Sequence, residues 1–349
     1  MIRLPIRGRG VPNDPPNRFE RVHRALDPGV VPEARLSEFI PDHTLSIVAR
    51  NESPDVGFDA SVNPYRGCEH GCVYCYARPT HEYLGFSSGL DFERKILVKQ
   101  RAPELLRSAL SRPSWKPQTL GLSGVTDPYQ PAERRFRLTR RILEVLRDFR
   151  NPVSIVTKNH LVTRDLDLLQ ELAAHDCVQV TLSITTLDKE LQSRMEPRTS
   201  VPAQRLKALE ALAEAGVPAG VNVAPVIPGL NDEEIPSILE AAKNAGAQRA
   251  AFLLLRLPHG VADHFSDWLA VHYPDRRERI LNRIRQVRAG ALNGTEFFTR
   301  SRGNGPHADN IARLFKVASA KAGFTEGPLG LSVAAFRRDG GVQGDLFAP

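Results

Sequence analysis

The chain has 349 residues, of which 41% are hydrophobic and 25% are charged, and its formal net charge is +7. No segment holds the roughly 18 consecutive apolar residues of a membrane span, and the amino terminus lacks the apolar core of a secretory signal, so we expect a cytoplasmic protein without a membrane partner. Four cysteines are too few for a secreted disulfide scaffold, and the positive charge favours an anionic partner.

Residues 1–57 are rich in proline and arginine and show little apolar periodicity. Pro28, Pro32 and Pro41 interrupt any long helix. We therefore expect an irregular amino-terminal arm with at most short ordered pieces.

Six short apolar runs divide the next segment, residues 58–255, and predict buried parallel strands covered on both faces. They lie at 58–62, 118–124, 152–157, 178–184, 219–227 and 249–255. Helical apolar spacing separates the later runs, at 138–149, 160–175, 202–216 and 231–246. This alternation predicts an α/β fold, and six units fit an open, partial (β/α)6 barrel of parallel strands better than a closed eightfold barrel. Ligands of such folds lie at the carboxyl ends of the strands.

The segment 256–325 is predicted as a helical carboxy-terminal extension, with candidate helices at 260–271, 275–289 and 308–322. Residues 326–349 are rich in glycine, and we expect them to form a flexible tail.

Three of the four cysteines, Cys68, Cys72 and Cys75, follow the first predicted strand with the spacing Cys-x3-Cys-x2-Cys. Three thiolates so close together can hold three irons of a cubane cluster and leave the fourth iron open to bind a substrate. The alternative is a structural zinc site with His81 or His70 as the fourth ligand. A redox Cys-x2-Cys pair gives the third cysteine no role.

The string around these cysteines resembles the radical S-adenosylmethionine (SAM) superfamily, whose cluster loop has this spacing with an aromatic residue before the third cysteine, here Tyr74. The resemblance implies a [4Fe–4S] cluster on Cys68, Cys72 and Cys75, with SAM on the open iron. It also implies that one electron breaks the sulfur–C5′ bond of SAM, and that the 5′-deoxyadenosyl radical takes hydrogen from a substrate. The superfamily's fold is a partial (β/α)6 barrel, and its electron comes from an external donor of the flavodoxin or ferredoxin type.

A second string, residues 123–133, together with Asn63-Pro-Tyr-Arg-Gly, resembles the branch that contains spore photoproduct lyase and its uncharacterised bacterial relatives. Those lyases repair a thymine–thymine methylene crosslink in spore DNA, and a cysteine near the end of their second strand returns hydrogen to the product. Leu120 to Pro131 contain no cysteine here, and Cys177 precedes the fourth predicted strand, at the opposite end of the sheet. We expect a relative that acts on another substrate, with Cys177 as a buried apolar side chain.

Polar residues near the strand ends are the candidate ligands of SAM. They are Tyr74, Lys158, Ser183, Arg198 and Asn222. Lys158 and Arg198 are candidate partners of the SAM carboxylate, with exposed surface cations as the alternative. Ser183 and Asn222 stand where the superfamily contacts the sugar and the carboxylate of SAM, and ordinary strand hydrogen bonding is the alternative.

Asp127 follows the second predicted strand and is our candidate catalytic residue, because a carboxylate there can orient the substrate or the methionyl amine. The alternative is that Asp127 only caps a turn.

Two helical stretches are rich in arginine, which suits phosphate groups. The arginines are Arg134, Arg135, Arg137, Arg140 and Arg141 in the first stretch, and Arg276, Arg277, Arg279, Arg283, Arg285 and Arg288 in the second. A solvated helix face is the alternative for either stretch. With the resemblance, they make nucleic acid a candidate substrate.

The tail string Gln343-Gly-Asp-Leu346-Phe347 resembles the peptide with which bacterial repair proteins dock on the replication sliding clamp. Our hypothesis is that it tethers the chain to the clamp. Two other functions stay open: a zinc-stabilised nucleic-acid-binding protein without catalysis, and a radical SAM enzyme that acts on a peptide or small metabolite.

Overall fold

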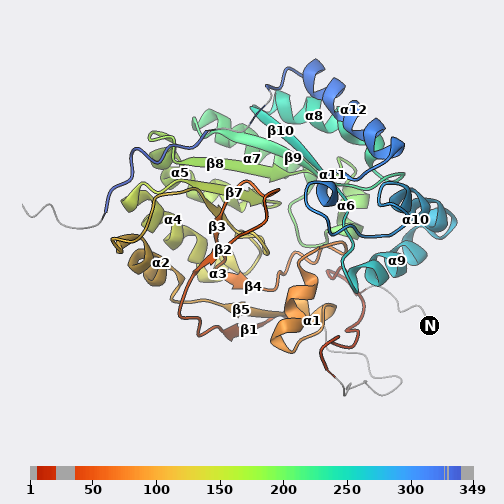
Figure 1. Ribbon diagram of the computed structural model, residues 1–349, viewed down its shortest axis with the longest axis horizontal. Coiled ribbons are helices and arrows are strands. Elements are labelled where there is room, and N and C mark those ends of the chain that lie inside the picture. Colours follow the sequence, from red (N-terminus) through yellow and green to blue (C-terminus); the bar gives the residue numbers. More distant parts are fainter. Residues whose placement is uncertain (1–5, 21–35, 326, 328–329, 339–349) are drawn as a thin grey trace, which may run out of the picture.

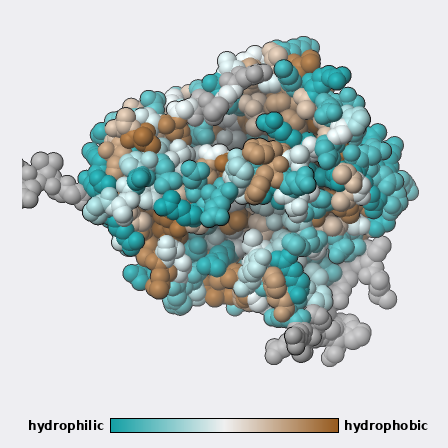
Figure 2. All heavy atoms as spheres, in the orientation of Figure 1, coloured by the Kyte–Doolittle hydropathy of each residue, from teal (hydrophilic) through white to brown (hydrophobic). Residues whose placement is uncertain are grey.

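A computed structural model describes residues 6–20, 36–325, 327 and 330–338. The proposed clamp-binding string Gln343–Phe347 lies outside these residues. Within them, no helix is long and apolar enough to cross a membrane. The face shown in Figure 2 is mainly hydrophilic, and its hydrophobic residues form small separate groups.

The centre of the molecule is a seven-stranded sheet in the order β10-β9-β8-β7-β6-β3-β2 (Figure 1). All neighbouring strands from β3 to β10 are parallel, and only the edge strand β2 (Val48–Arg50) is antiparallel. The six parallel strands are β3 (Ala60–Val62), β6 (Leu120–Leu122), β7 (Val153–Thr157), β8 (Val178–Ser183), β9 (Ala219–Val226) and β10 (Arg249–Leu254). Each lies within one predicted run, so the open, partial barrel of six parallel strands is confirmed.

The amino-terminal arm contributes two short strands to the fold. One is β2, and the other is β1 (Glu38–Pro41), which pairs with β5 (Lys95–Val98) in a small second sheet that also contains β4 (Tyr65–Arg66). Both arm strands pair with segments that flank the cysteine loop in sequence. The short ordered pieces expected in the arm therefore belong to the framework of that loop.

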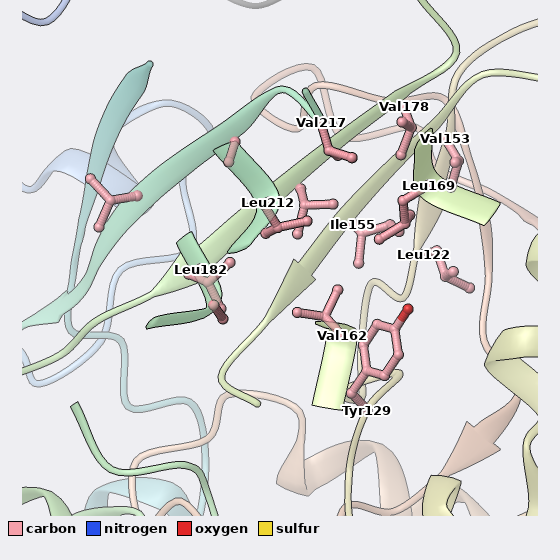
Figure 3. Packing of buried hydrophobic residues seen from close by; sticks show 14 of the residues in the cluster. Leu122, Tyr129, Val153, Ile155, Val162, Leu169, Val178, Leu182, Leu212 and Val217 are labelled. Carbon is pink, nitrogen blue, oxygen red and sulfur yellow. The ribbon is translucent and has the colours of Figure 1, made fainter. Parts of the chain in front are cut away.

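Helices cover one face of the sheet because each buries one apolar stripe against it. In α4 (Leu138–Phe149), residues Ile142, Leu143, Leu146 and Phe149 recur at helical spacing and are all buried. The other helices with members in this core are α2 (Ala102–Ser111), α5 (Leu166–Ala173), α7 (Pro202–Glu214) and α8 (Ile235–Asn244). Figure 3 shows Leu169 and Leu212 packed against sheet residues such as Ile155 and Val178.

The two faces of the sheet differ, contrary to the expectation that apolar residues cover both. Val153 and Ile155 of the central strand β7 are fully buried in the helix-covered core. The intervening Val156 points the other way and is 39% exposed, as is Leu253 of β10 at 40%. An open barrel leaves its second face accessible, which the predicted strand run at 152–157 did not reveal.

The carboxy-terminal extension is helical, as predicted. It contains α9 (Val261–His272), η4 (Pro274–Arg276), α10 (Arg277–Gln286), α11 (Thr299–Arg302) and α12 (Pro306–Lys321). α12 packs on α8 at the outer side of the sheet. α9 and α10 form a second core with Cys72, Val73 and Tyr74, so the extension supports the cysteine loop.

Short helices complete the connections between strands. They are η1 (Arg78–Leu84), α1 (Leu90–Arg94), α3 (Glu133–Phe136), η2 (His160–Asp165), α6 (Lys189–Met195) and η3 (Asp232–Glu234). Cys177 precedes β8 at the amino end of the sheet and is fully buried, in agreement with its expected packing role.

Candidate active site at the carboxyl ends of the strands

The three clustered cysteines lie in the loop between β4 and η1. All three are free thiols; Cys68 and Cys72 are buried, and Cys75 is partly exposed. The loop turns tightly at Gly71, whose φ of 68° suits glycine. A Cβ atom there would lie 2.8 Å from Glu93 Oε2, so only glycine lets the loop approach this carboxylate.

A buried ion pair fastens the cysteine loop to its surroundings. The fully buried Arg78 donates from Nε to the carbonyl of Cys72 at 3.0 Å and from Nη2 to Glu93 Oε1 at 2.5 Å. Glu93 also accepts the backbone N–H groups of Gly10 at 3.0 Å and Val11 at 3.2 Å. The amino-terminal segment, α1 and the cysteine loop therefore share one satisfied polar centre.

The donor set fits an iron–sulfur cluster better than one zinc ion. Burial raises the pKa of all three thiols, so stable thiolates here require a bound metal. His70 bonds to Asn159 and approaches Asp127, while His81 packs between Phe86 and Phe92. Among the described residues, no three His, Cys, Asp or Glu side chains are grouped to hold one metal ion. A cubane cluster has no such need, because each thiolate binds its own iron.

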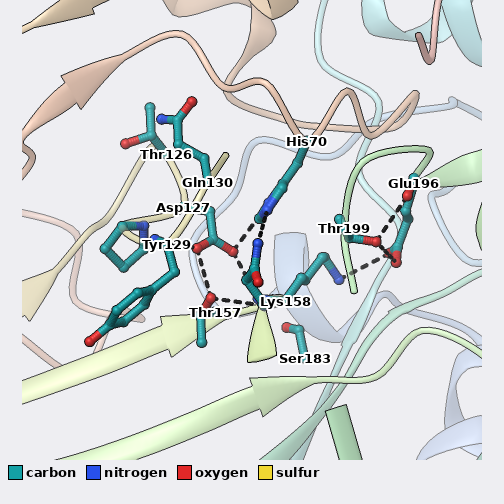
Figure 4. A network of polar contacts seen from close by, with 12 residues as sticks. His70, Thr126, Asp127, Tyr129, Gln130, Thr157, Lys158, Ser183, Glu196 and Thr199 are labelled. Atoms are coloured by element: carbon teal, nitrogen blue, oxygen red, sulfur yellow. Dashed lines mark hydrogen bonds and ion pairs between the residues drawn. The ribbon is translucent and has the colours of Figure 1, made fainter. Parts of the chain in front are cut away.

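Asp127, the candidate catalytic residue, lies between the cysteine loop and the end of β7 (Figure 4). Its carboxylate accepts the Thr157 hydroxyl at 2.7 Å and the backbone N–H groups of Tyr129 and Lys158, both at 2.8 Å. His70 Nδ1 lies 3.4 Å from it. Burial opposes its ionisation, yet His70 and these hydrogen bonds hold the pKa of Asp127 below its usual value. The contacts make Asp127 an anchor between two segments, and its catalytic role stays a prediction.

Glu196 is the central charged residue that the sequence analysis missed. It is fully buried and accepts hydrogen bonds from the hydroxyls of Tyr74 and Thr185 and from the Arg205 guanidinium. Burial opposes its ionisation, but Arg205 and Lys158 hold the pKa of Glu196 well below its usual range. In the sequence, the one feature that pointed to Glu196 was its place in the string Met195-Glu-Pro-Arg198. Only Arg198 of this string was named as a candidate site residue.

Tyr74 and Lys158, both candidate SAM-binding residues, meet at Glu196. Lys158 Nζ lies 3.2 Å from Glu196 Oε1 and donates to Thr185 Oγ1 at 3.0 Å and to the carbonyl of Ala224 at 2.9 Å. Figure 4 shows the ammonium pointing toward Glu196. The carboxylate partner of Lys158 is thus a residue of the chain itself, and its contact with SAM stays a prediction.

Ser183 and Asn222 are direct neighbours on β8 and β9. Among the residues that the structure describes, none provides a hydrogen-bond partner for the buried Asn222 Oδ1, which is costly unless a ligand supplies one. This orphaned oxygen fits the expected binding of a polar cosubstrate at the strand ends. Arg198 lies apart from this pair, because its guanidinium contacts Glu69 Oε1 at 3.1 Å and Ser37 Oγ at 3.4 Å.

The comparison with protein families finds one matching model, described as the radical SAM superfamily, over residues 62–242. The match begins at the end of β3 and ends within α8, so it contains the cysteine loop and the strand ends around Asp127, Glu196 and Asn222.

Similar sequences include an uncharacterised protein of Mycobacterium tuberculosis, 39% identical over 244 residues that cover 68% of this chain and 71% of the relative. An uncharacterised protein of Methanocaldococcus jannaschii is 31% identical over 222 residues, or 64% of this chain and 79% of the relative. The FeMo cofactor biosynthesis protein NifB of Azotobacter vinelandii is 29% identical over 141 residues, 37% of this chain and 27% of that protein.

Among solved structures, a variant of spore photoproduct lyase matches with a TM-score of 0.59 and 16% identity, covering 82% of both chains. Another structure of that lyase, with bound AdoMet and dinucleoside spore photoproduct, matches with a TM-score of 0.50 and 17% identity over 68% of this chain and 66% of that chain. At this identity, the likeness shows a shared fold.

Proposed function

The chain belongs to the radical SAM superfamily, and from that membership we propose that it is an enzyme that binds a [4Fe–4S] cluster through Cys68, Cys72 and Cys75 and cleaves SAM reductively. The observation that carries the proposal is the cysteine loop, which holds three free thiols beside the carboxyl ends of the parallel strands. When bound, the cluster supplies the electron that breaks the sulfur–C5′ bond of SAM and so starts radical chemistry on a substrate.

The chain's own residues prepare this site in two ways. Arg78 and Glu93 hold the loop that presents the cysteines, so the thiols need little reorganisation when metal binds. Asn222 offers an unpaired buried oxygen beside Ser183, which suits a hydroxyl or ammonium group of SAM. We assign the SAM carboxylate to Lys158 or Arg198. Lys158 would then bind both SAM and Glu196, and Arg198 would bind both SAM and Glu69.

Anaerobic reconstitution with iron and sulfide tests the proposal. We expect brown protein that absorbs near 400 nm as thiolate-ligated clusters do, about four irons per chain, and 5′-deoxyadenosine after reduction with SAM. Cys72→Ala should lose the absorbance, whereas Cys177→Ala, which removes the thiol outside the loop, should keep it. Colourless protein with one stoichiometric zinc would favour the zinc-binding alternative instead.

We further propose that the substrate is nucleic acid. The net charge of +7 supports this, as do the arginines Arg134, Arg137 and Arg279, which are exposed. Arg140 and Arg141 are paired with acidic residues and contribute less. Anaerobic turnover with damaged DNA and RNA oligonucleotides in deuterated water is the test, with label in a nucleic-acid product as the expected result. Label confined to a peptide or small metabolite supplied in parallel would contradict it.

Two partners complete the proposal. A flavodoxin or ferredoxin would supply the electron. The test replaces the chemical reductant with a reduced flavodoxin or ferredoxin, and SAM cleavage that depends on this protein would support the assignment. The tail Gln343–Phe347 would dock on the sliding clamp, and a chain without residues 343–349 that binds the clamp equally well in a pull-down would contradict this.

A further inference from the structure

Three arginines gather where the chain leaves β10, the last strand of the sheet. Arg256 follows β10 directly after Leu255, Arg288 follows α10, and Arg300 lies in α11. Within the described part of the chain, Asp55 is the one carboxylate paired with any of them, through Nε of Arg300 at 2.7 Å. Three cations facing one anion leave a local excess of two positive charges.

Arg288 builds this corner of the molecule. It is 5% exposed and donates to the carbonyls of Leu254 at 3.0 Å, Leu255 at 2.7 Å and Thr299 at 3.1 Å. Burial, and after it the neighbouring Arg256, lower the pKa of Arg288 to about 10. These bonds hold the exit of β10 against α11, so the position of Arg256 is fixed by the framework rather than by a flexible loop.

Arg256 has no comparable partners in the described part of the chain. Its buried Nε meets no hydrogen-bond acceptor there, and its guanidinium lies 5.9 Å from the ring centre of Tyr76, the residue after Cys75. Tyr76 is 51% exposed and donates its hydroxyl to the carbonyl of Gly124 after β6, so Arg256 lies beside the cysteine loop at the carboxyl ends of the strands. Asp55 attracts Arg256 only at longer range, and a partly buried cation without a directly paired anion is costly, so a bound anion would lower that cost.

Exposed aromatic rings flank the same cluster. Phe297 is 49% exposed with the Arg300 guanidinium 4.8 Å from its ring centre, and Phe298 is 60% exposed. Asp55 accepts the Phe298 backbone N–H at 3.0 Å and so fixes this turn. Flat apolar rings next to guanidinium groups form the kind of surface on which nucleic-acid bases stack, while the planar guanidinium suits phosphate.

We propose that Arg256, supported by Arg288 and Arg300, binds a phosphate group of single-stranded nucleic acid at the exit of β10, and that Phe297 and Phe298 stack against its bases. The proposal rests on the proposed function, because it names the surface by which a nucleic-acid substrate would reach the cysteine loop. It assigns the three arginines different tasks: Arg256 contacts the phosphate, Arg288 fixes the strand exit, and Arg300 orients the aromatic turn.

Fluorescence anisotropy with a labelled single-stranded DNA and the reconstituted holoenzyme tests the phosphate contact. Arg256→Gln should weaken binding about tenfold and make the salt dependence shallower by about one unit of slope. The matched control is Arg112→Gln, which removes an exposed arginine at the end of α2 and should change the affinity less than about twofold. Arg256→Lys keeps the charge but loses the planar fork, and it should fall between the two. Equal affinities for the Arg256→Gln and Arg112→Gln variants would overturn the proposal.

One competition experiment and one pair of variants define the ligand. Inorganic phosphate should displace the oligonucleotide more strongly than chloride at equal ionic strength, and this difference should vanish in Arg256→Gln; no difference in the native protein overturns the phosphate site. Phe297→Ala should lower the affinity for the oligonucleotide about tenfold and the affinity for a mononucleotide less. Phe19→Ala, at another exposed ring, should change neither affinity. A mononucleotide that binds as tightly as the oligonucleotide would overturn the nucleic-acid assignment.

The failure of this inference is distinguishable from failure of the proposed function. Native holoenzyme that forms 5′-deoxyadenosine, but binds DNA without dependence on Arg256, retains the function and loses the inference. Native protein that takes up no cluster loses the function, whatever its DNA affinity. Iron content and thermal unfolding of each variant show whether a loss of binding comes from misfolding.

Discussion

The two buried carboxylates at the strand ends, Asp127 and Glu196, do similar work with different partners. Each joins segments that are distant in sequence. Asp127 joins the loop after β6 to β7 and to the cysteine loop. Glu196 joins the cysteine loop to the end of β8 and to α7. Asp127 is held mainly by neutral donors, two backbone N–H groups and a hydroxyl. Glu196 is held by two cations, Arg205 and Lys158.

The difference teaches which carboxylate carries more of the stability. When a carboxylate is replaced by an amide, neutral donors can still donate to the amide oxygen, which also accepts hydrogen bonds. Buried cations lose their charge partner in the same replacement, and the uncompensated buried charge destabilises the fold. Both networks meet at Lys158, whose backbone N–H bonds to Asp127 and whose ammonium contacts Glu196.

Glu196→Gln should give the largest effect. The change leaves Arg205, which is 1% exposed, and Lys158 without their common anion, so we expect a loss of about 3–5 kcal/mol in the free energy of unfolding. Urea denaturation of the metal-free protein measures it, with Glu190→Gln on the exposed side of α6 as the control. The comparison breaks if the Glu196 variant is no less stable than the control.

Acid should destabilise the native protein by less than the substitution does, because the folded pKa of Glu196 lies well below its usual range and moderate acid protonates only part of this carboxylate. The folded pKa of both carboxylates lies below the ordinary value of about 4. Their contribution is therefore fully present above that value and is lost as the pH falls through the lower, folded pKa. Urea midpoints measured from about pH 6 downward should fall below about pH 5. The fall should be shallower in Glu196→Gln, and an identical pH profile would show that Glu196 does not titrate with folding.

Asp127→Asn should have a smaller effect, of about 1–3 kcal/mol, because the amide still accepts at one oxygen but cannot satisfy all the donors. Urea denaturation measures the loss, and Asp263→Asn in α9 is the control because nothing in the described structure pairs with it. A cost above that of Glu196→Gln would reverse the comparison. If the reconstituted variant binds SAM normally but turns over slowly, Asp127 also has the catalytic role predicted for it.

The fold was largely predictable, because each parallel strand is a short apolar run and each intervening helix has its own periodicity. That the three cysteines lie in one loop was predictable because their spacing is local, whereas their role as cluster ligands stays a prediction. Glu196 was not, since Tyr74 is 122 residues away in sequence and no local pattern reports such a contact. The roles of Asp127 and Arg288 were hidden for the same reason: their partners are backbone groups of other segments, which any sequence could supply.

Tyr74→Phe tests the comparison of Asp127 and Glu196 through the smallest expected loss of stability. The change removes only the hydroxyl that bonds to Glu196, while the ring keeps its packing in the second core and Glu196 keeps Arg205 and Lys158. We expect a loss of about 0.5–1.5 kcal/mol, against less than about 0.5 kcal/mol for Tyr83→Phe, whose ring is exposed. Urea denaturation resolves the two. A loss as large as that of Glu196→Gln would mean that the cysteine loop, through Tyr74, is the main partner of the carboxylate. The two cations would then be secondary, and Glu196 would stabilise the loop in the same way as Asp127, through neutral donors.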